Sequence, residues 1–262
     1  MAKRNNGTAS ELITATGGFQ RATSQAKRRL IGTIDGLEKC GKDHFALTSP
    51  GPIGIISLDL GLDGVIQKFQ DKKEIWVAEH RVNTTKLRAE HSMEEVASVA
   101  DEAWNNIMRD YQEMLASGAR TGIIDTGSEL WEILRLARFG KLDKVMPHHY
   151  GPVNAEFREI IRMAYDTGMN LWLLHKMKDE YTNDKRTGDV KRAGFSDMGF
   201  LVQIAVRCWR DDESQYPDNF HATVTDCRHD PSLHAFDMQG KMASVATLGQ
   251  LVFPDSEAEE WA

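Results

Sequence analysis

Residues 30–43 read LIGTIDGLEKCGKD, an apolar run followed by a turn that two glycines bound. Gly36 opens the turn, Gly41 closes it, and Lys42 and Asp43 come next. A loop that holds phosphates needs glycines so that backbone N–H groups can point inward, a helix N-terminus behind it, and a lysine that reaches the β and γ oxygens. The apolar run supplies a strand before the turn, and residues 44–48 suit a short helix after it. This context predicts a phosphate-binding loop at Gly36–Asp43.

The eighth position of this loop departs from the usual Walker A pattern, GxxxxGK followed by Ser or Thr. Asp43 stands where a hydroxyl side chain would bind magnesium. A carboxylate is a hard oxygen ligand and suits Mg²⁺, but it repels a triphosphate unless the metal neutralises it. Two interpretations of Asp43 therefore stay open: a magnesium ligand, or a change that weakens binding or abolishes hydrolysis. We expect nucleotide contacts from the whole loop and the residue after it: Gly36, Leu37, Glu38, Lys39, Cys40, Gly41, Lys42, Asp43 and His44.

Asp125, Asp59 and His175 each follow an apolar run directly. The carboxyl ends of parallel strands are where ligands collect in α/β sheets. Asp125 is expected to orient magnesium, or else to cap the helix that follows it. Asp59 is expected to polarise an attacking water, or to form the next turn. His175 is expected to contact the γ-phosphate, or to be a buried, hydrogen-bonded histidine.

Short apolar runs of strand length recur along the chain, and several are apolar at successive positions. They lie at 30–34, 53–58, 75–78, 122–124, 171–174, 200–206 and 220–224. Continuous apolar runs are typical of strands that are buried on both faces of a parallel sheet. Residues 93–115 repeat apolar side chains at helical spacing after the capping-box pair Ser92 and Glu95, and a second helix is expected at 155–167 with Asn154 as its N-cap. The predicted fold class is α/β, with a mostly parallel central sheet flanked by helices.

The composition divides the chain into one folded unit with short appendages. Residues 1–29 are rich in Ser, Thr, Gly, Asn and basic residues and are expected to form a flexible arm. Residues 30–250 hold the apolar runs and are expected to form one nucleotide-binding core, a size that α/β domains reach. Residues 251–262 include the acidic run DSEAEE and are expected to form a tail that remains solvated or competes with DNA for a basic surface.

Taken in order, the loop and the three strand ends resemble the motifs of bacteriophage-encoded RecA-like P-loop ATPases, a group that includes recombinases assisting single-strand annealing. The resemblance lies within residues 30–230 and rests on Gly36–Asp43, Ile53–Asp59, Ile123–Thr126 and Trp172–Lys176. It implies a RecA-like core with ATP and Mg²⁺ as cofactors. In that core Lys42 would bind phosphate, Asp125 would serve the metal, and His175 would couple the γ-phosphate to a DNA-binding loop. The chain departs from the family at Asp43, and at residues 60–61, where a glutamate is often found.

The resemblance also implies partners: single-stranded DNA, further copies of the chain in a ring or filament, and a single-strand-binding or annealing protein. The polar stretch 176–194 is expected to be a loop whose cations follow a DNA strand, namely Lys185, Arg186, Lys191 and Arg192. Alternatively the loop is merely solvated, because acidic residues offset these charges, or Lys176 and Lys178 reach a neighbouring subunit's nucleotide. Phe19 and Ala22 are similar to the Phe-x-x-Ala element through which RecA-type recombinases dock one subunit on the next.

Charge and hydropathy narrow the functional classes. The formal net charge of -7 argues against nucleic-acid binding over the whole surface but allows a local basic groove. No apolar run approaches the roughly 18 residues that span a bilayer, and no signal peptide is recognisable, so we expect a cytoplasmic protein without a membrane partner, in the host cell if a phage encodes it. Two functions stay open: a DNA-stimulated ATPase, and a nucleotide-binding scaffold or adaptor that has lost hydrolysis.

Overall fold

The computed structural model describes residues 28–59, 61–62, 64–142, 145–182 and 185–261. In this part of the chain a nine-stranded sheet has the order β3-β2-β4-β5-β1-β7-β8-β9, and β6 pairs with β5 outside this path. The strands are β1 (Ile31–Gly36), β2 (Ile53–Ser57), β3 (Ile75–Glu79), β4 (Thr121–Asp125), β5 (Asn170–Thr182), β6 (Lys185–Arg192), β7 (Ile204–Arg210), β8 (Phe220–Cys227) and β9 (Asp237–Gln239). From β3 to β7 the neighbours are parallel, whereas β6, β8 and β9 pair antiparallel.

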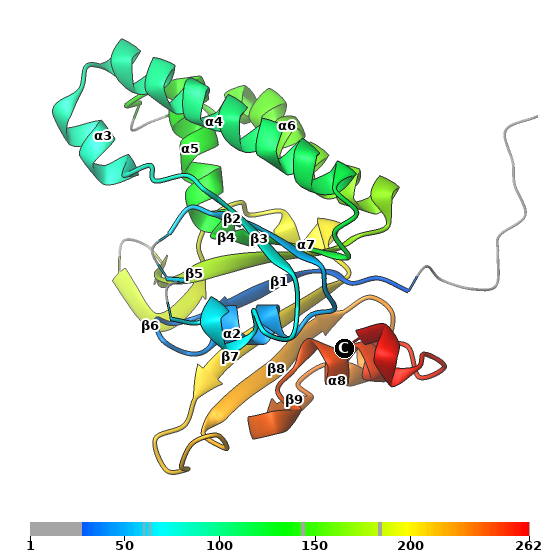
Figure 1. Cartoon of the computed structure of the whole chain (residues 1–262). Helices are drawn as coiled ribbons and strands as arrows, with labels where there is room; N and C mark the ends of the chain where they lie inside the picture. The colour runs from blue at the N-terminus through cyan, green and yellow to red at the C-terminus, as the bar shows by residue number, and fades with distance from the viewer. Residues whose placement is uncertain (1–27, 60, 63, 143–144, 183–184, 262) are drawn as a thin grey trace, which may run out of the picture.

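Helices cover both faces of this sheet (Figure 1). α4 (Met93–Ala116), α5 (Gly127–Phe139) and α6 (Tyr150–Thr167) lie on one face, and α2 (Lys42–Leu47) and α8 (Val245–Val252) lie on the other. Shorter helices and turns lie at the connections: α3 (Thr84–Glu90), α7 (Met198–Leu201), η1 (Ile66–Lys68), η2 (Pro147–His149), η3 (Pro231–Leu233), η4 (Gly240–Met242) and η5 (Ala258–Trp261). The predicted α/β architecture, a mostly parallel sheet flanked by helices, is confirmed.

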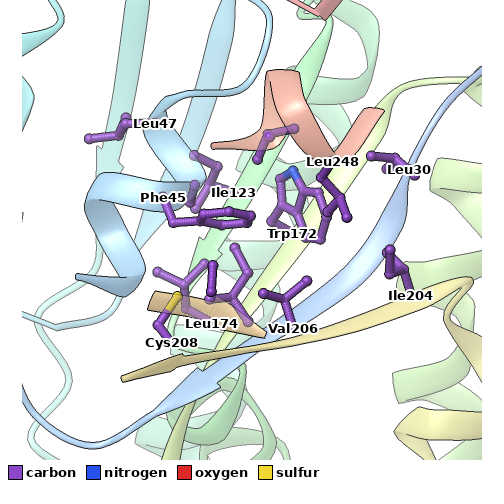
Figure 2. Close-up of a cluster of buried hydrophobic side chains, with 14 of the residues drawn as sticks. Leu30, Phe45, Leu47, Ile123, Trp172, Leu174, Ile204, Val206, Cys208 and Leu248 are labelled. Carbon is purple, nitrogen blue, oxygen red and sulfur yellow. The ribbon is translucent and has the colours of Figure 1, made fainter. Parts of the chain in front are cut away.

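Alternate residues of β5 face opposite helical layers. Leu171 and Leu173 belong to the cluster packed under α4, α5 and α6, while Trp172 and Leu174 belong to the cluster under α2 and α8. Figure 2 shows Trp172 and Leu174 within this second cluster. Because side chains alternate along a strand, the two residues that follow, 175 and 176, also face opposite ways.

The two long helices differ in how well their starts were predicted. α4 begins after Ser92, whose Oγ accepts the N–H of Glu95 while the Glu95 carboxylate accepts the N–H of Ser92, so the capping box is confirmed. α6 begins at Tyr150, and the expectation that Asn154 is its N-cap is wrong. Pro152 lies in the first turn of α6, where a missing N–H breaks no helical hydrogen bond. Likewise, the strand expected at 200–206 begins only at Ile204, because residues 198–201 form α7.

The segment expected to be a loop at 176–194 is a β-hairpin in its described residues. β5 continues to Thr182, and β6 returns antiparallel to it. Lys176 is the last residue of β5 in register with β1, and from Met177 onward β5 pairs with β6. Cross-strand hydrogen bonds satisfy the backbone without an apolar face, which explains why no apolar run marked these strands.

Residues 251–261 are not a solvated tail, contrary to expectation. Trp261 is 2% exposed and stacks on Phe253, with ring centroids 5.6 Å apart. Glu260 pairs with Arg28 at 2.5 Å, and its carbonyl oxygen accepts from Arg120 at 2.6 Å. These contacts hold the acidic segment on the core. The oligomerisation residues Phe19 and Ala22 lie outside the described residues.

Candidate nucleotide-binding site

The chain between β1 and α2 forms a turned loop at the carboxyl end of β1. Gly41 precedes α2 with a φ of 89°, and Lys39 also has a positive φ, 57°. Residues of alternating backbone handedness turn their N–H groups to one side and form an anion-binding concavity. Gly36 has no room for a side chain, because a Cβ there would lie 2.3 Å from the carbonyl oxygen of Cys208 in β7. The loop thus combines two residues of positive φ with a glycine that close packing against β7 requires.

Lys42 is the first residue of α2, and its side chain turns back over the loop. Its Nζ donates to the carbonyl oxygens of Gly36 at 3.1 Å and Leu37 at 2.7 Å. The ammonium is thus held beside the start of the loop, where it can meet a phosphate that the N–H groups bind.

The other loop side chains divide between solvent and core. Leu37, Glu38, Lys39 and His44 are exposed, whereas Cys40 is buried. The Sγ of Cys40 donates to the carbonyl oxygen of Leu37 at 2.9 Å. Any contact of Cys40 with a nucleotide would therefore come from its backbone.

Two carboxylates converge near the start of α2. Oδ2 of Asp43 and Oδ2 of Asp125 lie 3.7 and 4.0 Å from the position that a Cβ would take at Gly61. Asp43 belongs to the first turn of α2, and Asp125 ends β4, which β5 separates from β1. Within the described ranges, no three His, Cys, Asp or Glu side chains are grouped so that they alone could hold a metal ion. A carboxylate pair still suits Mg²⁺, which proteins usually bind through one or two carboxylates together with substrate phosphates.

Burial and mutual repulsion oppose ionisation of these two carboxyl groups. The pKa of Asp125 is raised from its ordinary 3.8 to about 7, first by burial and then by the negative charges of Asp43 and Asp59. Burial also raises the pKa of Asp43, and the charge of Lys42 opposes that shift. A bound cation stabilises the ionised form of carboxyl groups that are otherwise costly to ionise. The residues present therefore fit a divalent cation beside Asp43 and Asp125.

We expect Asp125→Asn to stabilise the metal-free protein at neutral to basic pH. The pKa of Asp125 is higher in the folded chain, so its contribution to stability is fully present below pH 3.8 and is lost as pH rises through about 7. Asparagine carries no charge at either end of this range. The variant should gain about 1–3 kcal/mol at about pH 8 and much less at about pH 5. Urea unfolding in the presence of a chelator measures both values, and an equal difference at the two pH values would contradict the assignment.

The N-cap of α5 is Thr126, the residue after Asp125. Thr126 Oγ1 accepts the N–H of Glu129 at 3.2 Å. The alternative role considered for Asp125, that of capping this helix, is therefore wrong. The peptide bond between Asp125 and Thr126 is cis.

Lys176, where the pairing of β5 with β1 ends, brings further groups to the same edge of the sheet. It is in register with Gly36, the first residue of the loop. Its Nζ pairs with Asp59 Oδ2 at 3.1 Å and with Glu129 Oε1 at 2.9 Å. Asp59 follows β2 as the sequence predicted, and its negative charge also acts on Asp43 and Asp125. Glu129 is a site residue that the sequence analysis missed, because an acidic residue in the first turn of a helix is ordinary.

His175 lies on the face of the sheet opposite to α2 and the loop. It is fully buried, its ring would be 2.8 Å from a Cβ at Gly127 of α5, and its Nδ1 lies 3.1 Å from the carbonyl oxygen of Ala193. Burial, followed by the charge of Arg192, lowers the pKa of His175 to about 3, so the ring is neutral. The expected contact between His175 and a γ-phosphate is therefore not supported, and the buried, hydrogen-bonded alternative describes it.

Most of the cations expected to contact DNA already have partners. Arg186 pairs with Asp179 at 2.5 Å and Lys191 with Glu180 at 3.2 Å, both within the hairpin. Arg192 donates to Thr33 Oγ1 at the base of the hairpin. Lys185 is exposed at the start of β6. Ion pairs on an exposed hairpin contribute little to stability, so a polyanion can displace them.

The chain is similar in structure to the crystal structure of the RadB recombinase. The two share 9% sequence identity with a TM-score of 0.44, over 80% of this chain and 84% of that chain. No protein-family model matches the chain, and no curated protein sequence matches it. In the part of the chain that the structure describes, no helix is long and apolar enough to cross a bilayer.

Proposed function

We propose that this protein is a RecA-like P-loop protein that binds ATP with Mg²⁺ and uses ATP to control its hold on single-stranded DNA. The observation that carries the proposal is the convergence of Lys42, Asp43 and Asp125 at the mouth of a loop with the backbone of an anion site. A lysine for the phosphates and a carboxylate pair for the metal are the parts that phosphoryl transfer requires.

Each group has a role that follows from its position. The loop N–H groups and Lys42 would hold the β and γ phosphates, and Asp43 and Asp125 would hold Mg²⁺, which neutralises phosphate charge when bound. Asp59 is the carboxylate best placed to orient a water, because it lies at the same edge of the sheet but outside the Asp43–Asp125 pair. Catalysis would consist mostly of positioning and charge neutralisation.

The biological setting belongs to the same proposal. The resemblance to phage RecA-like ATPases favours recombination or annealing in the cytoplasm of a host cell, with the β5–β6 hairpin as the DNA contact. Self-association in a ring or filament has one structural support, a groove of about 380 Å³ beside β3. Trp76 and Val77 of β3 line it and are 39% and 40% exposed. An edge strand next to an apolar groove suits an extended segment of another copy, and Phe19 and Ala22 are the proposed anchors.

A hydrolysis-deficient scaffold or adaptor is the second candidate, and Asp43 is the observation that favours it. Asp43 adds a third carboxylate to those of Asp125 and Asp59, and after burial the charges of Asp43 and Asp59 are the next causes of the raised pKa of Asp125. A nucleotide bound there experiences the same repulsion. Such a protein would bind ATP weakly and respond to binding without turnover.

Hydrolysis of ATP with magnesium, with and without single-stranded DNA, distinguishes the two candidates. DNA-stimulated turnover by the native protein that is lost in Lys42→Ala supports the ATPase. No turnover by the native protein, together with turnover gained in Asp43→Thr, supports the scaffold. Absence of ATP binding under all these conditions would reject both candidates.

If the scaffold candidate is correct, we expect Asp43→Thr to bind ATP with magnesium about tenfold more tightly than the native protein, because it removes a negative charge beside the triphosphate. Asp43→Asn is the matched control, since it removes the charge without adding a hydroxyl. Equal tightening in both variants assigns the effect to charge, and tightening in the threonine variant alone assigns it to the hydroxyl ligand. Weaker binding in both would show instead that the Asp43 carboxylate holds the metal. Isothermal titration calorimetry measures the three affinities.

A further inference from the structure

Glu129 connects the edge of the candidate site to a helix outside it. Its Oε1 accepts from Lys176 Nζ at 2.9 Å, and its Oε2 accepts from Thr84 Oγ1 at 3.1 Å. Each carboxylate oxygen therefore has a different partner, one in the middle of β5 and one at the start of α3. The Glu129 side chain is 25% exposed, so water screens these contacts only in part.

α3 depends on such contacts for its position. It is seven residues long and buries only Thr84 and Leu87. Leu87 packs with residues of α4 and α5, and polar contacts to α5 add to this: Glu129 accepts from Thr84, and Glu132 pairs with Arg88 at 2.9 Å. A short helix with so little buried surface belongs to the least stable part of a fold, where small changes in contacts alter local opening.

The Lys176 ammonium lies between competing anions. Asp59 and Glu129 both bind it in the structure, and its register partner Gly36 begins the phosphate loop. A nucleotide whose terminal phosphate extends beyond Lys42 brings a further, more highly charged anion to this edge. A lysine has a flexible stem and three donors, so it can exchange one anion for another without movement of β5.

We infer that Glu129 is a positioning residue: it holds Lys176 beside the phosphate loop and links the terminal phosphate of a bound nucleotide to α3. The inference rests on the proposed function. Lys176 leaves Glu129 for the terminal phosphate of a triphosphate and stays with Glu129 when a diphosphate is bound. The freed Glu129 carboxylate then turns to water, its bond to Thr84 weakens, and α3 opens more often.

The test compares the affinities of the full-length protein for ADP and for a non-hydrolysable ATP analogue. Glu129→Gln removes a competitor for the ammonium and should raise the preference for the triphosphate about threefold to tenfold, the range between an exposed ion pair and a charged hydrogen bond. Lys176→Met should abolish the preference that the ammonium provides. Hydrogen exchange of residues 84–90 in the native protein should be faster with the triphosphate analogue than with ADP, and in Glu129→Gln it should be the same with both.

Glu132→Gln is the matched control, since it weakens a different polar contact of α3, the ion pair with Arg88, without touching Lys176. It should speed exchange in α3 with either nucleotide and leave the triphosphate preference unchanged. Thr84→Val keeps the Lys176–Glu129 pair, so it should keep the preference and lose the nucleotide dependence of α3. If Glu129→Gln leaves the preference for the triphosphate unchanged, this inference is overturned but the proposed function is not. Failure of the native protein to bind either nucleotide would overturn the proposed function, and the inference with it.

Discussion

Lys42→Ala is expected to weaken ATP binding by about 100-fold or more. The Lys42 Nζ is held at the loop by the carbonyl oxygens of Gly36 and Leu37, and a bound triphosphate offers it stronger, charged acceptors. A hydrogen bond to a charged group contributes about 1.5–3 kcal/mol, and a lysine that meets two phosphates makes more than one. Alanine supplies none of them. Fluorescence titration with a labelled ATP measures the loss.

Lys72→Ala provides the comparison, because Lys72 is exposed and its substitution removes the same charge at a position outside the site. Its affinity should stay within about twofold of the native value, since exposed charges at a distance are screened by salt. Both variants should show the native far-ultraviolet circular dichroism spectrum, which would confirm that neither substitution unfolds the chain. Equal affinities of Lys42→Ala and the native protein would mean that the loop does not bind the phosphates, and the proposed function would be wrong.

The strand, turn and helix around the candidate phosphate loop were predictable because the signals for them are local. Gly41 is required by its positive φ, and Gly36 is required by the close approach of β7. Both constraints act within one short segment. The strand runs and the capping box of α4 were predictable for the same reason. The apolar run before Asp125 correctly predicted that this residue ends a strand, whereas the sequence did not show that Thr126, and not Asp125, caps α5.

The choice between His175 and Lys176 was not predictable from the sequence. Residues 171–174 are apolar without alternation because β5 is buried on both faces, so the pattern does not show which face each residue takes. Trp172 and Leu174 face α2, which places His175 on the other side and leaves Lys176 at the edge with Asp59. Neighbouring residues of a strand lie on opposite faces of the sheet, so an assignment that is wrong by one residue places the side chain on the wrong face.

The hairpin and the C-terminal segment were missed for a different physical reason. β5 and β6 are stabilised beyond Lys176 by pairing with each other, and such pairing needs no apolar residues. Residues 255–260 read DSEAEE, and this acidic composition alone predicted a solvated segment. Trp261 packs against Gly249 of α8 and holds the segment there. No pattern in the sequence marks this contact, because it depends on one large side chain and one glycine.

Trp261→Ala is expected to destabilise the folded protein by about 3–5 kcal/mol, the range for removing a buried aromatic side chain. Trp261 is 2% exposed, and its ring lies so close to α8 that a Cβ at Gly249 would be 2.2 Å from Cδ2. Its Nε1 also donates to Ser256 Oγ at 2.8 Å. Alanine would leave a cavity between α8 and the end of the chain and would release the ion pair of Glu260 with Arg28. Urea unfolding measures the change.

Phe200→Ala is the matched control, because Phe200 is also aromatic but is 83% exposed. Its free energy of unfolding should stay within about 0.5 kcal/mol of the native value. If the two variants have equal stability, the C-terminal segment is solvated in solution. The hypothesis that it is an acidic tail competing with DNA for a basic surface would then be favoured. If Trp261→Ala alone is destabilised, the acidic residues act from fixed positions on the core. Glu260 contacts Arg120, which directly precedes the amino end of β4, whereas the β5–β6 hairpin lies at the carboxyl end of the parallel strand β5. The fixed segment therefore lies at the opposite edge of the sheet and cannot reach the hairpin.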